Sequence, residues 1–230
     1  MIVHERLITF SPNCFTSDGT IKPSALQYEF QEIGGEHAGA HGMGITEMVS
    51  EGLMWAVTKV KYRLFGRLQP NTPYRLVTYP RPHRGMLYQR DYQIFDADGT
   101  HLLNGISQWC IMDFTTRRIV RTNKDFVGEF NTDVLFPEGF ERFRPGELTP
   151  AGSYTISEHD LDGNNHTNNC RYADMVEQVL PALSATDFSI TFAKETRLGD
   201  TIQLFTSPAE NGRVIVCGMV DDQNVFSALI

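Results

Sequence analysis

The chain has 230 residues, of which 41% are hydrophobic and 21% charged, and its formal net charge is −8. This length and composition fit one large or two small globular domains. Because the sequence has no apolar run long enough for a membrane span, no signal-peptide pattern and no basic stripe, we expect a cytoplasmic protein with no membrane span and no nucleic-acid partner.

The four cysteines predict neither disulfides nor a metal site. Cys14, Cys110, Cys170 and Cys217 are widely spaced, form no C-x-x-C pair and do not cluster with the seven histidines. Free, buried thiols in a reducing compartment are the usual case for such a pattern. We therefore expect no metal ion and no other cofactor.

The first half of the chain predicts a strand, a helix and an antiparallel meander. Residues 4–15 indicate a strand and residues 17–19 a turn. Pro23 suits the first position of a helix that ends at Gly34-Gly35 or a few residues later. A short helical turn is expected at 46–51, before segments that alternate with a period of two. These expected strands are residues 53–65, 74–79, 86–95 and 101–114.

The second half repeats this order after a stretch without periodicity. Residues 122–150 contain several prolines and glycines, which indicates a linker. A strand is expected at 152–157, a turn at Asp162-Gly163 and a helix at 167–180. The remaining expected strands are residues 188–196, 201–207, 214–220 and 225–230.

This repeated order predicts an internal duplication. A single helix cradled by a curved antiparallel sheet is the hotdog arrangement, so we expect an α+β double hotdog with two long helices. The expected parts are an N-terminal repeat at 1–125, a linker at 126–149 and a C-terminal repeat at 150–230. The turn at Asp18-Gly19 would be the counterpart of the turn at Asp162-Gly163.

The turn before the second helix is crowded with polar side chains. Asp162, Asn164 and His166 stand two residues apart, Gly163 permits a positive φ, and the first N–H groups of a helix have no partner within it. Such a turn could hold a carbonyl group that becomes an oxyanion. The alternative is an Asx-rich capping turn with one surface histidine. The first turn, at Asp18-Gly19, continues T-I-K-P-S, with no Asn and no His. The polar set therefore occurs in the second half alone, and we expect one active site per chain.

The string D-L-D-x-N-x-H-x-N-N before an amphipathic helix resembles the signature of the acyl-[acyl carrier protein] thioesterases, of the bacterial type. Residues 42–64, 89–100 and 109–121 resemble segments of the same family. The resemblance implies hydrolysis of the thioester of a fatty acyl-[acyl carrier protein]. The product would be a free fatty acid, and its release would end fatty-acid synthesis.

The resemblance also implies the catalytic residues, Asp162, Asn164, His166 and Glu195. Thr196 stands where the family often has cysteine, and a threonine without a strong base beside it is a poor nucleophile. We therefore expect carboxylate chemistry, in which Glu195 or Asp162 activates water or Asp162 attacks directly. Asn164 would orient the nucleophile. His166 would donate to the base or the thioester, or protonate the departing thiol.

Two further groups of residues are expected to bind the substrate and its carrier. The cavity for the acyl chain would be lined by Leu26, Phe30, Met48, Met54 and Trp55. These residues could equally belong to the hydrophobic core. The acidic carrier protein would dock on a local basic run, which could equally be a solvated strand end, formed by Arg117, Arg118, Arg121 and Lys124. The chain would act as a monomer or a homodimer.

Three other functions remain open on the sequence alone. An acyl-CoA thioesterase of the same fold would differ only in the carrier of the acyl group. A hotdog hydratase would need another pairing of Asp and His. A protein that binds acyl thioesters without cleaving them would share the cavity but not the chemistry.

Overall fold

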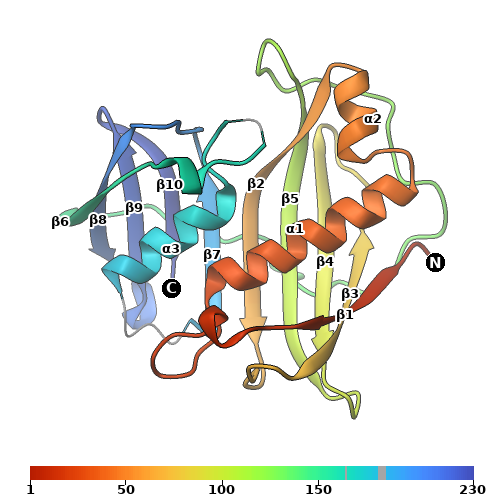
Figure 1. Cartoon of the computed structure of the whole chain (residues 1–230), viewed down its shortest axis with the longest axis horizontal. Coiled ribbons are helices and arrows are strands. Elements are labelled where there is room, and N and C mark those ends of the chain that lie inside the picture. Colours follow the sequence, from red (N-terminus) through yellow and green to blue (C-terminus); the bar gives the residue numbers. More distant parts are fainter. Residues whose placement is uncertain (164, 181–184) are drawn as a thin grey trace.

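The computed structural model describes residues 1–163, 165–180 and 185–230. Within this part of the chain, ten strands form one antiparallel sheet and three α-helices lie on one of its faces (Figure 1). The strands are β1 (His4–Thr9), β2 (Leu53–Leu64), β3 (Pro73–Pro80), β4 (Leu87–Phe95), β5 (His101–Asp113), β6 (Thr149–Thr155), β7 (Asp187–Phe192), β8 (Thr201–Pro208), β9 (Val214–Val220) and β10 (Gln223–Leu229). The helices are α1 (Pro23–Ala40), α2 (Ile45–Ser50) and α3 (Asn169–Val179), with 3-10 turns at Pro12–Cys14, Glu158–Asp160 and Glu210–Gly212.

The strand order is the same when the sheet is read inward from either edge. The order β1-β3-β4-β5-β2 continues as β7-β10-β9-β8-β6, so the second repeat mirrors the first about the centre. At that centre β2 and β7 pair antiparallel, with Lys61 opposite Ser189. The expected α+β double hotdog is thereby confirmed.

One apolar core runs under both long helices. In β8, Ile202 and Leu204 are buried while Gln203 between them is exposed, as the alternation of side chains along a strand requires. At the central seam, the ring of Tyr62 on β2 stacks on that of Phe188 on β7, with centroids 5.5 Å apart. The two repeats therefore share a continuous core.

Helix α1 runs further than the sequence predicted because its glycines do not end it. Pro23 opens the helix, and Leu26, Phe30 and Ile33 form its buried stripe. Gly34 lies where the helix crosses β4, and an added Cβ there would stand 3.5 Å from the side chain of Arg90. That distance is an ordinary van der Waals contact, and the helix continues over the sheet to Ala40.

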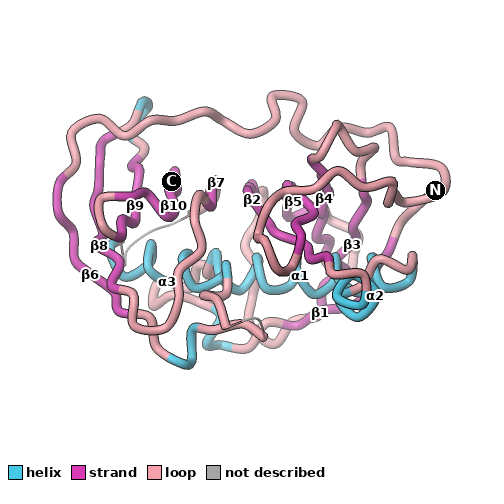
Figure 2. The backbone as a smooth tube through the Cα atoms, turned by 90° about the horizontal axis from the view of Figure 1, so that it is seen from above, coloured by secondary structure: helices cyan, strands magenta, loops and turns pink. Residues whose placement is uncertain are grey.

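The later part of the connection between the repeats covers the opposite face of the sheet. Residues 114–148 contain no helix or strand. Arg117 and Phe126 still lie on the helix side, and Figure 2 shows the long connection then passing on the side away from the helices. It brings Glu138 and Glu141 to the Nζ of Lys61, at 3.2 and 3.1 Å. The Lys61 side chain, which points away from the helix side of β2, is fully buried under Phe136 and these carboxylates.

Element boundaries differ from the expectations at three places. The first strand ends at Thr9 because Pro12 begins a 3-10 turn, and β6 begins at Thr149, inside the expected linker. Strand β7 ends at Phe192, so Glu195 and Thr196 lie beyond it. No helix in the described ranges is long and apolar enough to cross a membrane.

Candidate active site

The loop before α3 is closed by three hydrogen bonds between Asp162 and the residues that follow it. The N–H of Asp162 donates to the carbonyl of His166 at 2.8 Å, and the N–H of His166 donates back to Oδ1 of Asp162 at 3.2 Å. The N–H of Asn165 donates to the carbonyl of Asp162 at 3.1 Å. Asp162 and His166 are therefore fixed at the two ends of one small loop.

Among the described residues of this loop, Asn165 is left-handed, with φ 60°, and Gly163 is not, contrary to expectation. Asparagine tolerates this conformation because its short polar side chain can bond locally. Gly163 therefore does not provide the positive φ that the sequence suggested. The predicted catalytic residue Asn164 lies outside the described residues.

The first repeat contains the same loop, but in a different register from the expected one. Bridges join Phe15 to Ile21 and Leu161 to Thr167, and each first-repeat residue precedes its counterpart by 146 positions, as Pro23 precedes Asn169 at the helix starts. By this spacing Asp162 corresponds to Thr16, and the Asp-Gly pairs are not equivalent. The expected pairing of the two Asp-Gly turns is therefore wrong by two residues.

The hydrogen bonds of the two loops agree with this register. The N–H of Thr16 donates to the carbonyl of Thr20 at 2.8 Å, and the N–H of Thr20 donates to Oγ1 of Thr16 at 3.1 Å. The left-handed residue is Gly19, with φ 77°. Thr16 and Thr20 thus repeat the backbone roles of Asp162 and His166 without a carboxylate or an imidazole.

Thr196 joins this loop to the segment after β7. Its hydroxyl lies 2.7 Å from that of Thr167 and 2.9 Å from that of Tyr172, and its carbonyl accepts the N–H of Thr167 at 2.9 Å. The residue is 1% exposed. A threonine held in this way has a structural role, and it places its neighbour Glu195 beside the loop, with Oε2 3.5 Å from Nε2 of His166.

An arginine from the first repeat completes the cluster. Nε of Arg117 donates to Oε2 of Glu195 at 3.2 Å, and Nη2 donates to Oε1 of the same carboxylate. Nη2 also lies 3.2 Å from Nδ1 of His166, and Nη1 contacts the sulfur of Met54. The polar cluster is therefore assembled from both halves of the chain.

The four basic residues expected to dock the carrier are in different situations. The side chain of Arg117 is directed into the cluster, while Lys124 pairs with Glu51 at 2.6 Å. Arg118 and Arg121 are exposed and form no ion pair with the described residues. The docking role stays a prediction, and these last two are the cations free to fulfil it.

A cavity of about 400 Å³ lies beside the cluster, between α1, α2 and strands β2, β4 and β5. Of the residues expected to bind the acyl chain, Met48, Met54 and Trp55 line it. Leu26 and Phe30 do not, because they face the sheet and are fully packed in the core. The remaining lining includes Gly34, Gly35, Ala38, Ile45, Val49, Leu53, Val57, Tyr88, Trp109, Phe126, Asp162, Gly163 and Asn169.

The side of the cavity at β4 holds a buried cation. Arg90 is 6% exposed, and none of the described carboxylates lies within ion-pair distance of it. Its Nη1 donates to Nδ1 of His37 at 2.9 Å and to Oγ1 of Thr78 at 3.3 Å. Burial lowers the pKa of Arg90, and burial together with the Arg90 charge lowers the pKa of His37 to about 3. His37 is therefore neutral at physiological pH.

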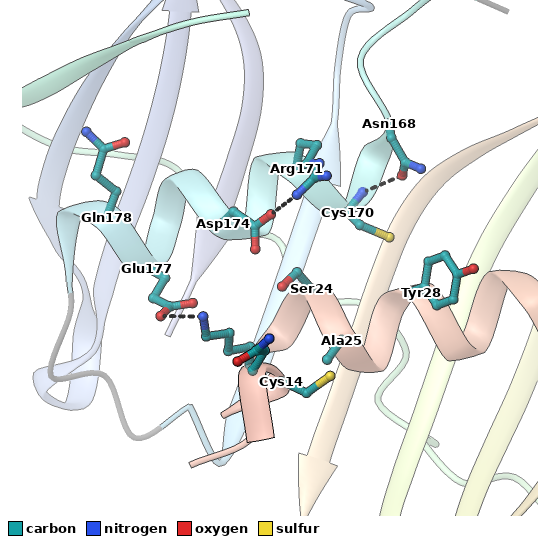
Figure 3. Close-up of a pocket in the computed structure, with 12 residues that line it drawn as sticks. Cys14, Ser24, Ala25, Tyr28, Asn168, Cys170, Arg171, Asp174, Glu177 and Gln178 are labelled. Atoms are coloured by element: carbon teal, nitrogen blue, oxygen red, sulfur yellow. Dashed lines mark hydrogen bonds and ion pairs between the residues drawn. The ribbon is translucent and has the colours of Figure 1, made fainter. Parts of the chain in front are cut away.

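A second groove, of about 690 Å³, lies on the outer side between α1 and α3 (Figure 3). Its charges are paired with one another, Lys22 with Glu177 at 3.5 Å and Arg171 with Asp174 at 3.1 Å. Burial raises the pKa of the Cys170 thiol to about 12, so that this sulfur is no nucleophile at neutral pH. No histidine is among the described residues that line this groove, so it lacks the carboxylate–imidazole pair of the cluster.

Metal-binding side chains do not gather anywhere in the described ranges: no three His, Cys, Asp or Glu residues come together there as ligands.

Two family models match nearly the whole chain. The one described as Acyl-ACP thioesterase N-terminal domain covers residues 15–130, and the one described as Acyl-ACP thioesterase C-terminal domain covers residues 149–226. A search of curated proteins finds no match.

Solved structures share the fold over their full length. An acyl-ACP thioesterase from Bacteroides thetaiotaomicron has a TM-score of 0.87 at 18% identity, over 99% of this chain and 96% of that chain. The 12:0-ACP thioesterase from Umbellularia californica has a TM-score of 0.83 at 17% identity, over 100% of this chain and 96% of that chain. At such identities the structures speak for the common fold alone.

Proposed function

The chain belongs to the acyl-ACP thioesterase family, and we propose that Asp162, His166 and Glu195 form its hydrolytic site. As a member of this family it is a thioester hydrolase, which releases a free fatty acid from a fatty acyl-[acyl carrier protein]. The observation that carries the site assignment is the position of Asp162, which lines the cavity together with Met54 and Trp55.

In this proposal the two repeats have different roles. The first repeat provides most of the cavity and so binds the acyl chain, and the second provides the carboxylates and the imidazole. The exposed cations Arg118 and Arg121 dock the acidic carrier, which brings the thioester to the end of the cavity where Asp162 lies.

Asp162 is the better placed of the two carboxylates to meet the thioester. It lines the cavity, whereas Glu195 lies outside the lining and is held by Arg117. In the proposed reaction, water attacks the carbonyl carbon while its proton passes to Asp162. The C–S bond then breaks, and the leaving sulfur takes the proton that Asp162 received from water, while the Nε2–H group of His166 donates a hydrogen bond to that sulfur. Asp162 is then a carboxylate again, which completes the cycle.

The start of α3 offers a donor to the developing oxyanion. Asn169 is the first residue of this helix and lines the cavity, and its N–H donates to no acceptor among the described residues. The N-terminal N–H groups of a helix have no partner within it and carry partial positive charge. A donor aimed at the charge that develops in the transition state is an effective catalytic element.

Release of free thiol from acyl-carrier substrates of several chain lengths tests this assignment. Asp162→Ala should lower kcat by about 10²- to 10⁴-fold, the range for loss of a general acid or base. Glu195→Ala should lower kcat by on the order of 10²-fold, because this carboxylate lies beside Nε2 of His166 and helps to position the ring. Asp174→Ala, which removes a carboxylate from the outer groove, is the matched control and should leave the rate unchanged. Undiminished release by both site variants would refute the assignment.

Oxygen-18 separates water attack from direct attack by Asp162. In a single turnover in labelled water, the label should enter the fatty acid and not the protein. Label found in the Asp162 carboxylate would instead show an anhydride intermediate.

A further inference from the structure

The position of Arg117 is fixed by the turn that follows β5. Oδ1 of Asp113 accepts the N–H groups of Thr115 and Thr116, at 3.1 and 2.6 Å, and the carbonyl of Asp113 accepts the N–H of Arg117 at 3.0 Å. Arg117 has a φ of 57°, an unfavourable conformation for a residue with a Cβ. A turn that holds an arginine in this way directs its side chain to one place.

That place is the second repeat's polar cluster. The guanidinium binds both oxygens of Glu195 and reaches Nδ1 of His166. The Arg117 side chain is only 22% exposed, in contrast to its neighbour Arg118, which is exposed. The charge of Arg117 is therefore used inside the protein and is not presented to a docking partner.

The contact with His166 has a chemical consequence. A guanidinium has five N–H donors, no acceptor, and does not lose its proton in proteins. When Nη2 of Arg117 lies 3.2 Å from Nδ1 of His166, that nitrogen can only accept. The proton of the neutral ring is then on Nε2, the nitrogen that faces Oε2 of Glu195 at 3.5 Å.

We propose that Arg117 is a positioning residue of the hydrolytic site, which holds the Glu195 carboxylate and keeps the proton of His166 on Nε2. This inference rests on the proposed function, because the Nε2–H group is the donor that hydrogen-bonds the leaving sulfur. A residue of the first repeat thereby sets the protonation of a residue of the second. The rigid fork of an arginine suits this task, since one planar group contacts two partners at once.

The tautomer can be measured without any assay of activity. Nitrogen-15 NMR of the histidine-labelled protein, with the His166 signals assigned by His166→Asn, should show the proton on Nε2. In Arg117→Gln the ring should sample both tautomers. A proton on Nδ1 in the unaltered protein would overturn the inference.

Kinetics provide the second test. Arg117→Gln should lower kcat by on the order of 10²-fold, the effect of a small misplacement of reacting groups, with KM changed less than about twofold. Arg117→Lys should have a kcat close to that of Arg117→Gln, because an ammonium group does not reproduce the planar fork of the guanidinium. Added methylguanidinium should restore part of kcat to Arg117→Ala. Arg197→Gln, which removes an exposed positive charge two residues from Glu195 in the chain, should keep kcat unchanged.

The outcomes separate three roles for Arg117. In a Glu195→Gln background, Arg117→Gln should lower kcat by less than about a further twofold. The reason is that both changes act through the same contact between Arg117, Glu195 and His166. A raised KM that depends on salt, with kcat intact, would make Arg117 a docking cation and overturn the inference. So would a loss of activity that follows a lower thermal unfolding midpoint and is not restored by methylguanidinium. If the unaltered protein releases no thiol, the proposed function fails first.

Discussion

The loops at residues 15–21 and 161–167 are closed by the same pattern of hydrogen bonds, but their side chains have different partners. In the first loop, the Asp18 carboxylate accepts hydrogen bonds from Thr16 and Thr20. Nη2 of Arg67 donates to the backbone carbonyl of Asp18 at 2.9 Å. In the second, Asp162 lines a cavity and His166 contacts groups from outside the loop. The first loop thus directs its carboxylate to its own threonines, whereas the second places Asp162 at a cavity and His166 beside Arg117 and Glu195. The same backbone arrangement therefore serves different surroundings in the two repeats.

The helices that follow these loops differ in a matching way. Helix α1 has 18 residues and α3 has 11, and the cavity beneath α1 adjoins the polar cluster. In the proposed function the first repeat provides the cavity and the second the catalytic groups. The following variants test how far this division holds.

Exchange of the counterpart residues should have the largest effect. Asp162→Thr installs the residue that closes the first loop, so the loop should fold while kcat for thiol release falls by about 10²- to 10⁴-fold. Thr16→Asp, the reciprocal change, should leave the rate unaltered because no residue of that loop lines the cavity beside the polar cluster. Equal losses from the two changes would mean that Asp162 matters only for the fold of its loop.

Removal of the Thr196 hydroxyl should have the next largest effect. Thr196→Val leaves the hydroxyls of Thr167 and Tyr172 without their shared partner in a buried site. The free energy of unfolding, measured in urea, should fall by about 1–3 kcal/mol. Thr196→Ser keeps the hydroxyl and should lose less. A valine variant as stable as the parent would show that this junction does not hold the loop.

Acid should destabilise the first repeat through His37. Its folded pKa of about 3 is below the ordinary 6.5, so the unfolded chain takes up the proton first as the pH falls. This contribution to stability is complete above pH 6.5 and should decline by about 2 kcal/mol between pH 7 and pH 5. His37→Gln, which can still accept from Arg90, should lack this decline in urea unfolding at the two pH values. An identical decline in the variant would assign it to other groups.

The two glycines should give the smallest effects, and unequal ones. Gly163 has no positive φ, and an added Cβ would meet nothing within 4 Å. Gly163→Ala should therefore change the free energy of unfolding by less than about 0.5 kcal/mol. Gly19 has a φ of 77°, so Gly19→Ala should cost about 1–2 kcal/mol. Thermal unfolding of the two variants measures this difference. A larger loss of stability from Gly163→Ala than from Gly19→Ala would contradict the register assigned to the loops.

The sequence predicted the fold because two independent patterns agreed. Alternation located the strands, and the repeated order of strand, turn, helix and meander predicted the tandem arrangement. The string from Asp162 to His166 also located the polar loop, since its residues are neighbours in the chain. Its inner geometry was harder to predict. Glycine and asparagine both tolerate a positive φ, and the pattern does not say which of Gly163 and Asn165 adopts it.

Contacts between distant segments were beyond the sequence. Arg117 meets His166 and Glu195 only because β2 and β7 are neighbours in the sheet, and no local spacing encodes that meeting. The acyl-chain prediction failed in part for a related reason. Phe30 in the core and Met48 at the cavity are both apolar and 1% exposed, so hydrophobicity and burial do not distinguish them.

The connection that crosses the back of the sheet has a consequence for how the protein responds to dilution. Two separate hotdog units would meet at the β2–β7 seam only above a certain protein concentration. Tethered by residues 114–148, they meet at the high effective concentration of an intramolecular contact. Because Glu138 and Glu141 also neutralise the buried Lys61, cutting this tether would leave a charge unpaired in the seam. Turnover per molecule should therefore be independent of enzyme concentration.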